Sequence, residues 1–210
     1  MAIKEKDEYN WAEYTSEYAA QLETIAEKEN DLFVNEVSFK ESDVVFKDNI
    51  HPNWKEIYST VVRLNPKSVY EVGCGCGMHL MNIKKMMPHI EVGGCELLPS
   101  QVQLGITKYN LPNSIFRNID FVDFTNTGNV KIFASPAEFV YSHAVCMHLS
   151  SEHAKSFLKN MSIIAEKYIL LVEGVNNHEN WYDMVKECLP EFEFELTSKY
   201  IDYGILLTRK

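Results

Sequence analysis

The sequence predicts an α/β protein of three layers, in which helices enclose a seven-stranded, mostly parallel sheet with an antiparallel hairpin strand at the C-terminal end. Three observations support this prediction. Short apolar runs alternate with longer stretches of helical spacing, as expected for parallel strands joined by helical crossovers. A turn with glycines at alternate positions follows one apolar run, at residues 73–77. Two later runs, 192–196 and 203–207, are separated by a connection short enough for a hairpin.

The size and charge of the chain limit the partners it is expected to have. Its 210 residues suit one domain with a sizeable core and a terminal extension. The formal net charge of −10 argues against broad surfaces for nucleic acid or anionic membranes, because those partners bind lysine and arginine. Five cysteines without a repeating framework, and no secretory signal, indicate a reduced, cytoplasmic protein. We therefore expect a small-molecule partner, and neither nucleic acid nor membrane.

The N-terminal part of the chain is patterned differently from the rest. Between residues 9 and 30, aromatic and aliphatic side chains recur every three or four positions, which predicts a helix with one apolar face. Residues 31–50 have no clear period, and we expect a loop with one short element there. We therefore divide the chain into an N-terminal helical extension or lid, 1–50, and a main domain, 51–210.

The main domain is expected to open with a helix and then to alternate strands and helices. His51, Pro52 and Asn53 mark the start of the first helix, and Ser150 marks the start of a later one. The apolar patterns predict helices at 53–64, 78–87, 99–109, 151–164 and 181–189. They predict strands at 69–72, 90–96, 115–119, 139–142, 168–172, 192–196 and 203–207.

The glycine turn is the strongest sign of a ligand site. Gly73, Gly75 and Gly77 lack the Cβ atoms that would hold a ligand away from the main chain, and they permit positive φ. A nucleoside cofactor can therefore lie against this turn, although such a turn can also be purely structural. Glu71, just before the turn, could bind an amine or a hydroxyl group. Glu96 lies about 20 residues beyond the turn, the spacing at which an acid after the second strand reaches ribose hydroxyls.

Three segments resemble class I S-adenosylmethionine-dependent methyltransferases. They are Glu-Val-Gly-Cys-Gly-Cys-Gly at 71–77, Glu-Leu at 96–97 and Phe-Val-Tyr-Ser-His-Ala-Val-Cys-Met-His-Leu at 139–149. That family has an acid, any residue, and then glycines at alternate positions, whereas dinucleotide dehydrogenases usually separate the second and third glycines by two residues. The resemblance extends from about Asn53 to the C-terminus. One departure is Glu138, where family members often carry an aspartate shortly before the fourth strand.

The resemblance implies a Rossmann-like fold, S-adenosylmethionine as the cofactor and S-adenosylhomocysteine as its product. It also implies that Asp120 and Phe121, with Asp123 as an alternate acid, lie beside the adenine, and that Tyr14 in the N-terminal helix covers the cofactor. Tyr14 and Tyr18 can equally belong to an aromatic stripe that only packs in the core. The implied cofactor-binding residues are Glu71, Gly73, Cys74, Gly75, Gly77, Glu96, Leu97, Asp120, Phe121, Ser142 and Tyr14.

Two histidines are the candidate catalytic residues. His143 and His148 follow the predicted fourth strand, where open α/β sheets place ligand chemistry, and imidazole titrates near neutral pH. Either could take a proton from the methyl acceptor or bind it. The polar segment 173–178, after the fifth strand, is a plausible wall of the acceptor site.

We expect no metal site. On a helix, the five-residue spacing of His143, His148 and His153 would place them on different faces. Cys74 and Cys76 lie inside the glycine turn and, with Cys95, lack the paired spacing that is typical of zinc ligands.

The function expected from this sequence is methyl transfer to an oxygen or nitrogen of a small molecule. Two alternatives remain open: a nicotinamide-dependent oxidoreductase that uses a similar cofactor site, and a non-catalytic protein that binds the cofactor as a partner subunit. The alternate glycines and the closing hairpin count against the oxidoreductase. The identity of the acceptor and the oligomeric state do not follow from the residues.

Overall fold

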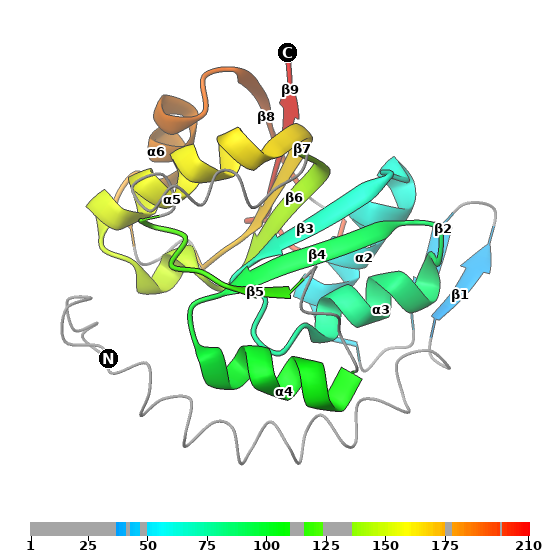
Figure 1. Ribbon diagram of the computed structural model, residues 1–210. Helices are drawn as coiled ribbons and strands as arrows, with labels where there is room; N and C mark the ends of the chain where they lie inside the picture. The colour runs from blue at the N-terminus through cyan, green and yellow to red at the C-terminus, as the bar shows by residue number, and fades with distance from the viewer. Residues whose placement is uncertain are drawn as a thin grey trace.

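The computed structural model describes residues 37–40, 43–46, 50–109, 116–123, 136–174, 178–197 and 199–210 (Figure 1). The helix predicted at 9–30, and with it Tyr14 and Tyr18, lies outside the described residues.

A seven-stranded sheet forms the middle layer, in the order β5-β4-β3-β6-β7-β9-β8. Strands β5, β4, β3, β6 and β7 pair in parallel, whereas β9 is antiparallel to both of its neighbours. This confirms the predicted fold class, including the closing hairpin. In sequence order the strands are β3 (Ser68–Val72), β4 (Glu91–Glu96), β5 (Phe116–Asn118), β6 (Ala137–His143), β7 (Ala165–Val172), β8 (Phe192–Leu196) and β9 (Ile205–Arg209).

The strand order creates a switch point between β3 and β6. From β3 the chain proceeds outward to β4 and β5, and then returns to β6 on the other side of β3. Val72, Cys95 and Ser142 are aligned across the three central strands, so the carboxyl ends of β3, β4 and β6 meet at one edge. In open α/β sheets, ligands bind at such an edge.

Helices cover both faces of the sheet (Figure 1). On one face, Ile57, Leu80 and Val102 share a buried cluster with the sheet. On the other face, Phe157 and Met184 share a second cluster with it. The helices of the first face are α2 (Pro52–Leu64), α3 (Met78–Met86) and α4 (Pro99–Tyr109), and those of the second are α5 (Ser151–Ile164) and α6 (Trp181–Cys188).

The helix starts follow the expected capping chemistry. The side chain of His51 accepts a hydrogen bond from the backbone N–H of Asn53, at 3.2 Å, and Pro52 occupies the first helical position of α2. Ser150 caps α5 by accepting from the backbone N–H of His153, at 3.3 Å.

Several element boundaries differ from those expected. Within 31–50, the described residues form two short strands, β1 (Val37–Lys40) and β2 (Asp43–Phe46), which pair antiparallel, whereas one short element was expected there. Strand β7 begins at Ala165 and not at Tyr168. The exposed, charged residues Glu166 and Lys167 near its start interrupt the apolar pattern from which the strand was predicted. Strand β9 continues to Arg209, since polar Thr208 still pairs with Glu193.

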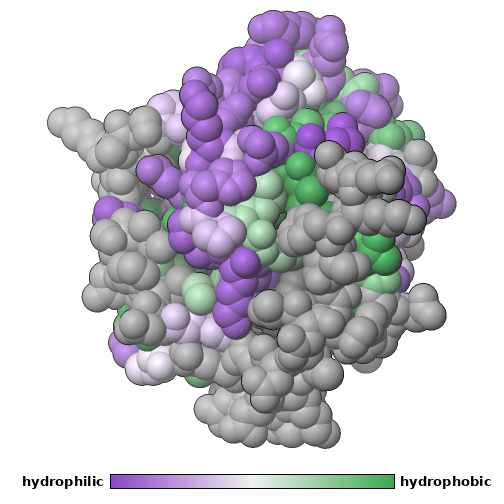
Figure 2. Space-filling model, turned by 90° about the vertical axis from the view of Figure 1, so that its right-hand side faces the viewer, coloured by the Kyte–Doolittle hydropathy of each residue, from purple (hydrophilic) through white to green (hydrophobic). Residues whose placement is uncertain are grey.

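The described surface is mostly hydrophilic on the face shown in Figure 2. Large apolar side chains that are exposed come from four separate places, at Val45, Leu97, Ile163 and Leu196. None of the described helices combines the length and apolar character needed to cross a membrane.

Candidate functional site

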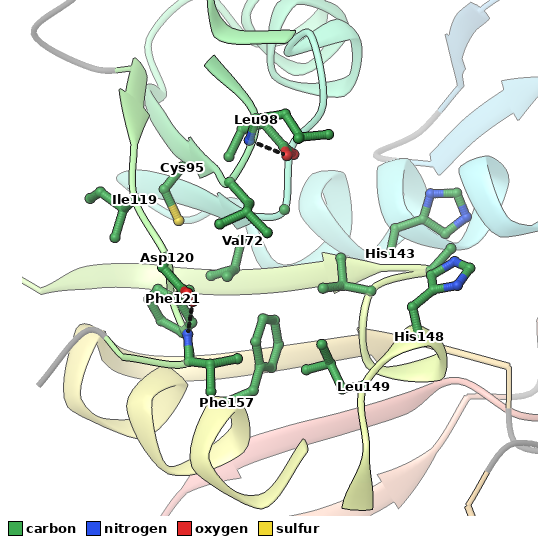
Figure 3. Close-up of a pocket in the computed structure, with 16 residues that line it drawn as sticks. Val72, Cys95, Leu98, Ile119, Asp120, Phe121, His143, His148, Leu149 and Phe157 are labelled. Carbon is green, nitrogen blue, oxygen red and sulfur yellow. Dashed lines mark hydrogen bonds between the residues drawn. The ribbon is translucent and has the colours of Figure 1, made fainter. Parts of the chain in front are cut away.

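A cavity of about 360 Å³ opens at the carboxyl ends of β3, β4, β5 and β6 (Figure 3). Its volume is in the range of small-molecule sites, about 300–1,000 Å³. Seven of the residues expected at the site line it: Gly73, Glu96, Leu97, Asp120, Phe121, His143 and His148.

The glycine turn has the conformation that only glycine adopts easily. Gly73, Gly75 and Gly77 have φ of 73°, 54° and 80°. A Cβ on Gly73 would lie 2.4 Å from Cγ2 of Val145, whereas a Cβ on Gly75 would meet nothing within 4 Å. The first glycine is therefore needed for packing, and the second faces open space that a ligand can occupy.

Glu96 ties the end of β4 to this turn. Its Oε2 accepts a hydrogen bond from the backbone N–H of Gly75, at 2.9 Å, and its Oε1 accepts from that of Leu98, at 3.0 Å. Burial raises the pKa of Glu96, and these backbone N–H groups oppose the rise. The carboxylate thus lies beside the turn, where the spacing in the sequence predicted it.

Asp120 and Phe121 form another part of the wall. Asp120 is exposed, and its Oδ1 accepts from the backbone N–H of Val122 at 3.0 Å. The buried ring of Phe121 meets that of Phe157 edge-on, with centroids 5.3 Å apart. This part of the cavity therefore combines a carboxylate with a flat apolar wall, a combination that suits a nucleoside base.

The two histidines lie at the end of the cavity opposite Ile119 and Asp120 (Figure 3). His143 is the last residue of β6, and His148 ends a short helix, η3 (Cys146–His148). Burial, and then the charge of His51, lowers the pKa of His143 to about 4, and burial also lowers the pKa of His148. Both rings are therefore mostly uncharged at neutral pH.

Other expected residues do not line the cavity. Gly75 and Gly77 belong to the turn beside it. The Cys74 thiol donates to the carbonyl oxygen of Cys95, at 3.2 Å, and packs in the core. The hydroxyl of Ser142 is buried and donates to Glu173 Oε1, at 2.7 Å. Their roles in cofactor binding stay predictions.

Glu71 is also absent from the cavity lining and is almost completely buried. Its Oε2 has no hydrogen-bond partner among the described residues. Burial raises its pKa to about 8, a nearby Tyr141 hydroxyl opposes this, and Glu96 adds to it. The carboxyl group is therefore mostly protonated at neutral pH.

We expect Glu71→Gln to remove about 2–3 kcal/mol of the stability that the protein loses between pH 6 and 9. The folded-state pKa of about 8 lies above the ordinary 4.5, so the folded state holds the proton more tightly. The contribution of this group to stability is complete only below about pH 4.5 and falls as the pH rises to 8, which amounts to a loss of about 2–3 kcal/mol between pH 6 and 9. Urea unfolding at the two pH values measures this difference. Glu91→Gln, at an exposed position of β4, should keep the full slope, and an unchanged slope in Glu71→Gln would contradict the prediction.

Glu173 braces the turn after β6, a role that the sequence did not predict, since it placed Glu173 only in the wall of the acceptor site. It is buried after β7, and its Oε2 accepts from the backbone N–H of Val145, at 2.8 Å, while Oε1 accepts from Ser142. Burial raises its pKa to about 7, against these hydrogen bonds. Ala144 lies between Ser142 and Val145 in the chain and has a φ of 55°, an uncommon conformation for a residue with a Cβ. Glu173 thus holds the turn that carries His143 and the start of η3.

No group of three potential metal ligands is found within the described ranges. His143, His148 and His153 lie on β6, η3 and α5, so the helical geometry assumed for them from the sequence does not apply.

No family model matches the sequence, and no curated protein sequence matches it significantly. Solved structures do match the fold. A sugar N-methyltransferase from Streptoalloteichus aligns with a TM-score of 0.59 at 12% identity, over 78% of this chain and 89% of that one. An amino pentose methyltransferase from Micromonospora echinaspora aligns with 0.57 at 13%, over 76% and 91%.

A third match is magnesium protoporphyrin IX methyltransferase from Synechocystis, solved with bound S-adenosylmethionine. It aligns with a TM-score of 0.54 at 15% identity, over 75% of this chain and 78% of that one. At such identities the likeness concerns the fold. The chain therefore has the Rossmann-like fold of the class I S-adenosylmethionine-dependent methyltransferases.

Proposed function

We propose that this protein is an S-adenosylmethionine-dependent methyltransferase that acts on an oxygen or nitrogen of a small molecule. The observation that carries the proposal is the cavity at the switch point of a methyltransferase fold. Gly73, Glu96, Asp120, His143 and His148 all line that cavity, and the two histidines lie at the end opposite Asp120 (Figure 3). A nucleoside end and a reaction end are thereby joined in one space.

The residues present suit this cofactor. The open space in front of Gly75 admits a ligand to the main chain, and Glu96 lies directly beside it. In the proposed complex Glu96 would accept hydrogen bonds from the ribose hydroxyls, and Phe121 and Asp120 would flank the adenine. Leu97 lines the cavity and is 43% exposed, and the bound ligand would cover part of its apolar side chain and remove that part from water.

The cofactor, when bound, supplies a methyl group on a positively charged sulfur, which makes the carbon electrophilic. The chain must then hold the acceptor in line and exclude water. His143 and His148 are uncharged near neutral pH, so either can bind an acceptor hydroxyl or amine through a ring nitrogen. An acceptor that must lose a proton needs a base at this end, and a neutral imidazole can take the proton.

The division of the chain into a catalytic domain and an extension is also part of the proposal. We infer that residues 51–210 form the catalytic domain and that 1–50 form an extension, from which Tyr14 covers the cofactor. The small-molecule acceptor, the cytoplasmic location and the lack of nucleic-acid or membrane partners rest on charge and composition. Adding Tyr14→Ala to the binding measurement below tests the cover, because loss of a covering side chain should weaken binding of the cofactor.

Isothermal titration with S-adenosylmethionine, S-adenosylhomocysteine and NADH tests the cofactor. We expect the first two to bind and Glu96→Ala to weaken them about 10–100-fold, because a hydrogen bond to a charged group contributes about 1.5–3 kcal/mol. Glu96→Gln, which keeps one acceptor oxygen, should lose less. Glu91→Ala, exposed on the same strand, is the control.

Binding of NADH alone would overturn the proposal in favour of an oxidoreductase. Cofactor binding without methyl transfer to any member of a screen of hydroxylated and amino compounds would favour a non-catalytic binding protein. Transfer in that screen would also show whether oxygen or nitrogen is methylated.

A further inference from the structure

A chain of hydrogen bonds links His143 to two residues outside the cavity wall. Asn53 Nδ2 lies 3.2 Å from His143 Nε2, and the Tyr203 hydroxyl donates to Asn53 Oδ1. The three residues come from the end of β6, the first turn of α2 and the segment before β9. Asn53 and Tyr203 are absent from the lining of the cavity, so they reach the site only through His143.

The surrounding contacts hold this chain in place. The backbone N–H of Asn53 donates to His51 Nδ1, at 3.2 Å, which fixes the start of α2. Glu56, buried on the same helix, accepts from the backbone N–H of Tyr200 at 3.0 Å, which ties the segment of Tyr203 to α2. The amide of Asn53 thus lies between a helix and a segment that are already joined.

The hydrogen-bond directions set the position of the hydrogen on the imidazole ring. Tyr203 donates to the amide oxygen, so the amide nitrogen of Asn53 faces His143, and an amide nitrogen can only donate. His143 Nε2 must then offer its lone pair, and the single hydrogen of the neutral ring lies on Nδ1.

We propose that Asn53 and Tyr203 are positioning residues that hold His143 as the neutral tautomer with its hydrogen on Nδ1. His143 then gives the acceptor site a hydrogen-bond donor, and His148 is left as the base for acceptors that lose a proton. This assignment of roles rests on the proposed function, but the tautomer itself does not.

The groups around His143 agree with a ring that stays neutral. Protonation at Nε2 would set an N–H against the N–H of Asn53. The ring of His79 lies 5.4 Å from that of His143, at 77°, and its Nδ1 is engaged by the Tyr58 hydroxyl at 2.6 Å. His51, His148 and Tyr203 are the other titratable groups that bear on the ring, and no carboxylate is hydrogen-bonded to it among the described residues. The low pKa of about 4 accords with this setting.

Nitrogen-15 NMR of histidine-labelled, cofactor-free protein at neutral pH tests the proposal. The chain has seven histidines, and His143→Gln identifies the signals of His143 by difference. We expect Nδ1 to give the signal of a protonated nitrogen and Nε2 that of an unprotonated one. A parent protein with the hydrogen on Nε2 would overturn the proposal.

Asn53→Asp should reverse the tautomer. A carboxylate at this position accepts a hydrogen bond from Nε2–H, and the pKa of His143 should rise to its ordinary value of about 6.5 or above. The variant should fold, because an acid in the first turn of a helix is favourable. Retention of the hydrogen on Nδ1 in this variant would also overturn the proposal.

Tyr203→Phe should free the amide to rotate and give both tautomers, whereas Tyr200→Phe, which removes a hydroxyl from the same segment, should leave the parent signals. Equal signals in the two variants would exclude a role for Tyr203. Titration of S-adenosylmethionine into the same samples tests the proposed function separately from the proposed tautomer. The hydrogen can lie on Nδ1 of His143 even if no cofactor binds.

Discussion

Gly73→Ala is expected to lower the free energy of unfolding by about 2–5 kcal/mol. Two effects contribute. A residue with a Cβ at φ 73° is strained by about 1–2 kcal/mol. The new Cβ would also lie 2.4 Å from Cγ2 of Val145, and overpacking of this kind costs about 1–3 kcal/mol or more. Urea unfolding of the variant measures the sum.

Two further variants separate these effects. Gly73→Ala with Val145→Ala removes the clash and should recover about half of the loss, so that the double-mutant cycle reports the contact directly. Gly75→Ala has the same kind of backbone strain without a clash, and should cost only about 1–2 kcal/mol in stability. Its Cβ points into open space, so this variant should instead weaken binding of S-adenosylmethionine. Equal losses of stability in Gly73→Ala and Gly75→Ala would contradict the packing role.

Glu173→Ala is also expected to lower the free energy of unfolding, by about 2–6 kcal/mol. The substitution leaves the Ser142 hydroxyl and the Val145 N–H without their acceptor. A buried polar group that loses its partner costs about 1–3 kcal/mol. The turn at Ala144 also loses its brace, so the His143–His148 segment should become less ordered and methyl transfer should fall with stability.

Glu173→Gln separates the hydrogen bonds from the volume of the side chain. The amide keeps one acceptor oxygen, but its nitrogen would face a donor, so we expect it to recover less than half of the loss. Glu179→Ala, exposed in the same connection, should leave stability within about 0.5 kcal/mol of the parent. Thermal or urea unfolding measures all three, and a Glu173→Ala variant as stable as Glu179→Ala would exclude the bracing role.

The sequence by itself determined the order of the elements and one side of the site. Strand, turn and helix around Gly73 follow from periodicity and from glycine spacing, which are local properties of the chain. The distance from this turn to Glu96 is set by one helix and one strand, and the hydrogen bond from Gly75 to Glu96 joins the two places. Parallel pairing then brings these strand ends to one edge, whatever the rest of the chain does.

Only the tertiary structure decided the environments of the buried polar groups. Glu71 is almost completely buried and absent from the cavity lining, and its expected role at the cofactor stays a prediction. Ser142 and Glu173 are 31 residues apart, and Asn53 and Tyr203 are 150 apart. Hydrogen bonds over such separations have no local pattern, because they depend on which faces meet when the helices close over the sheet.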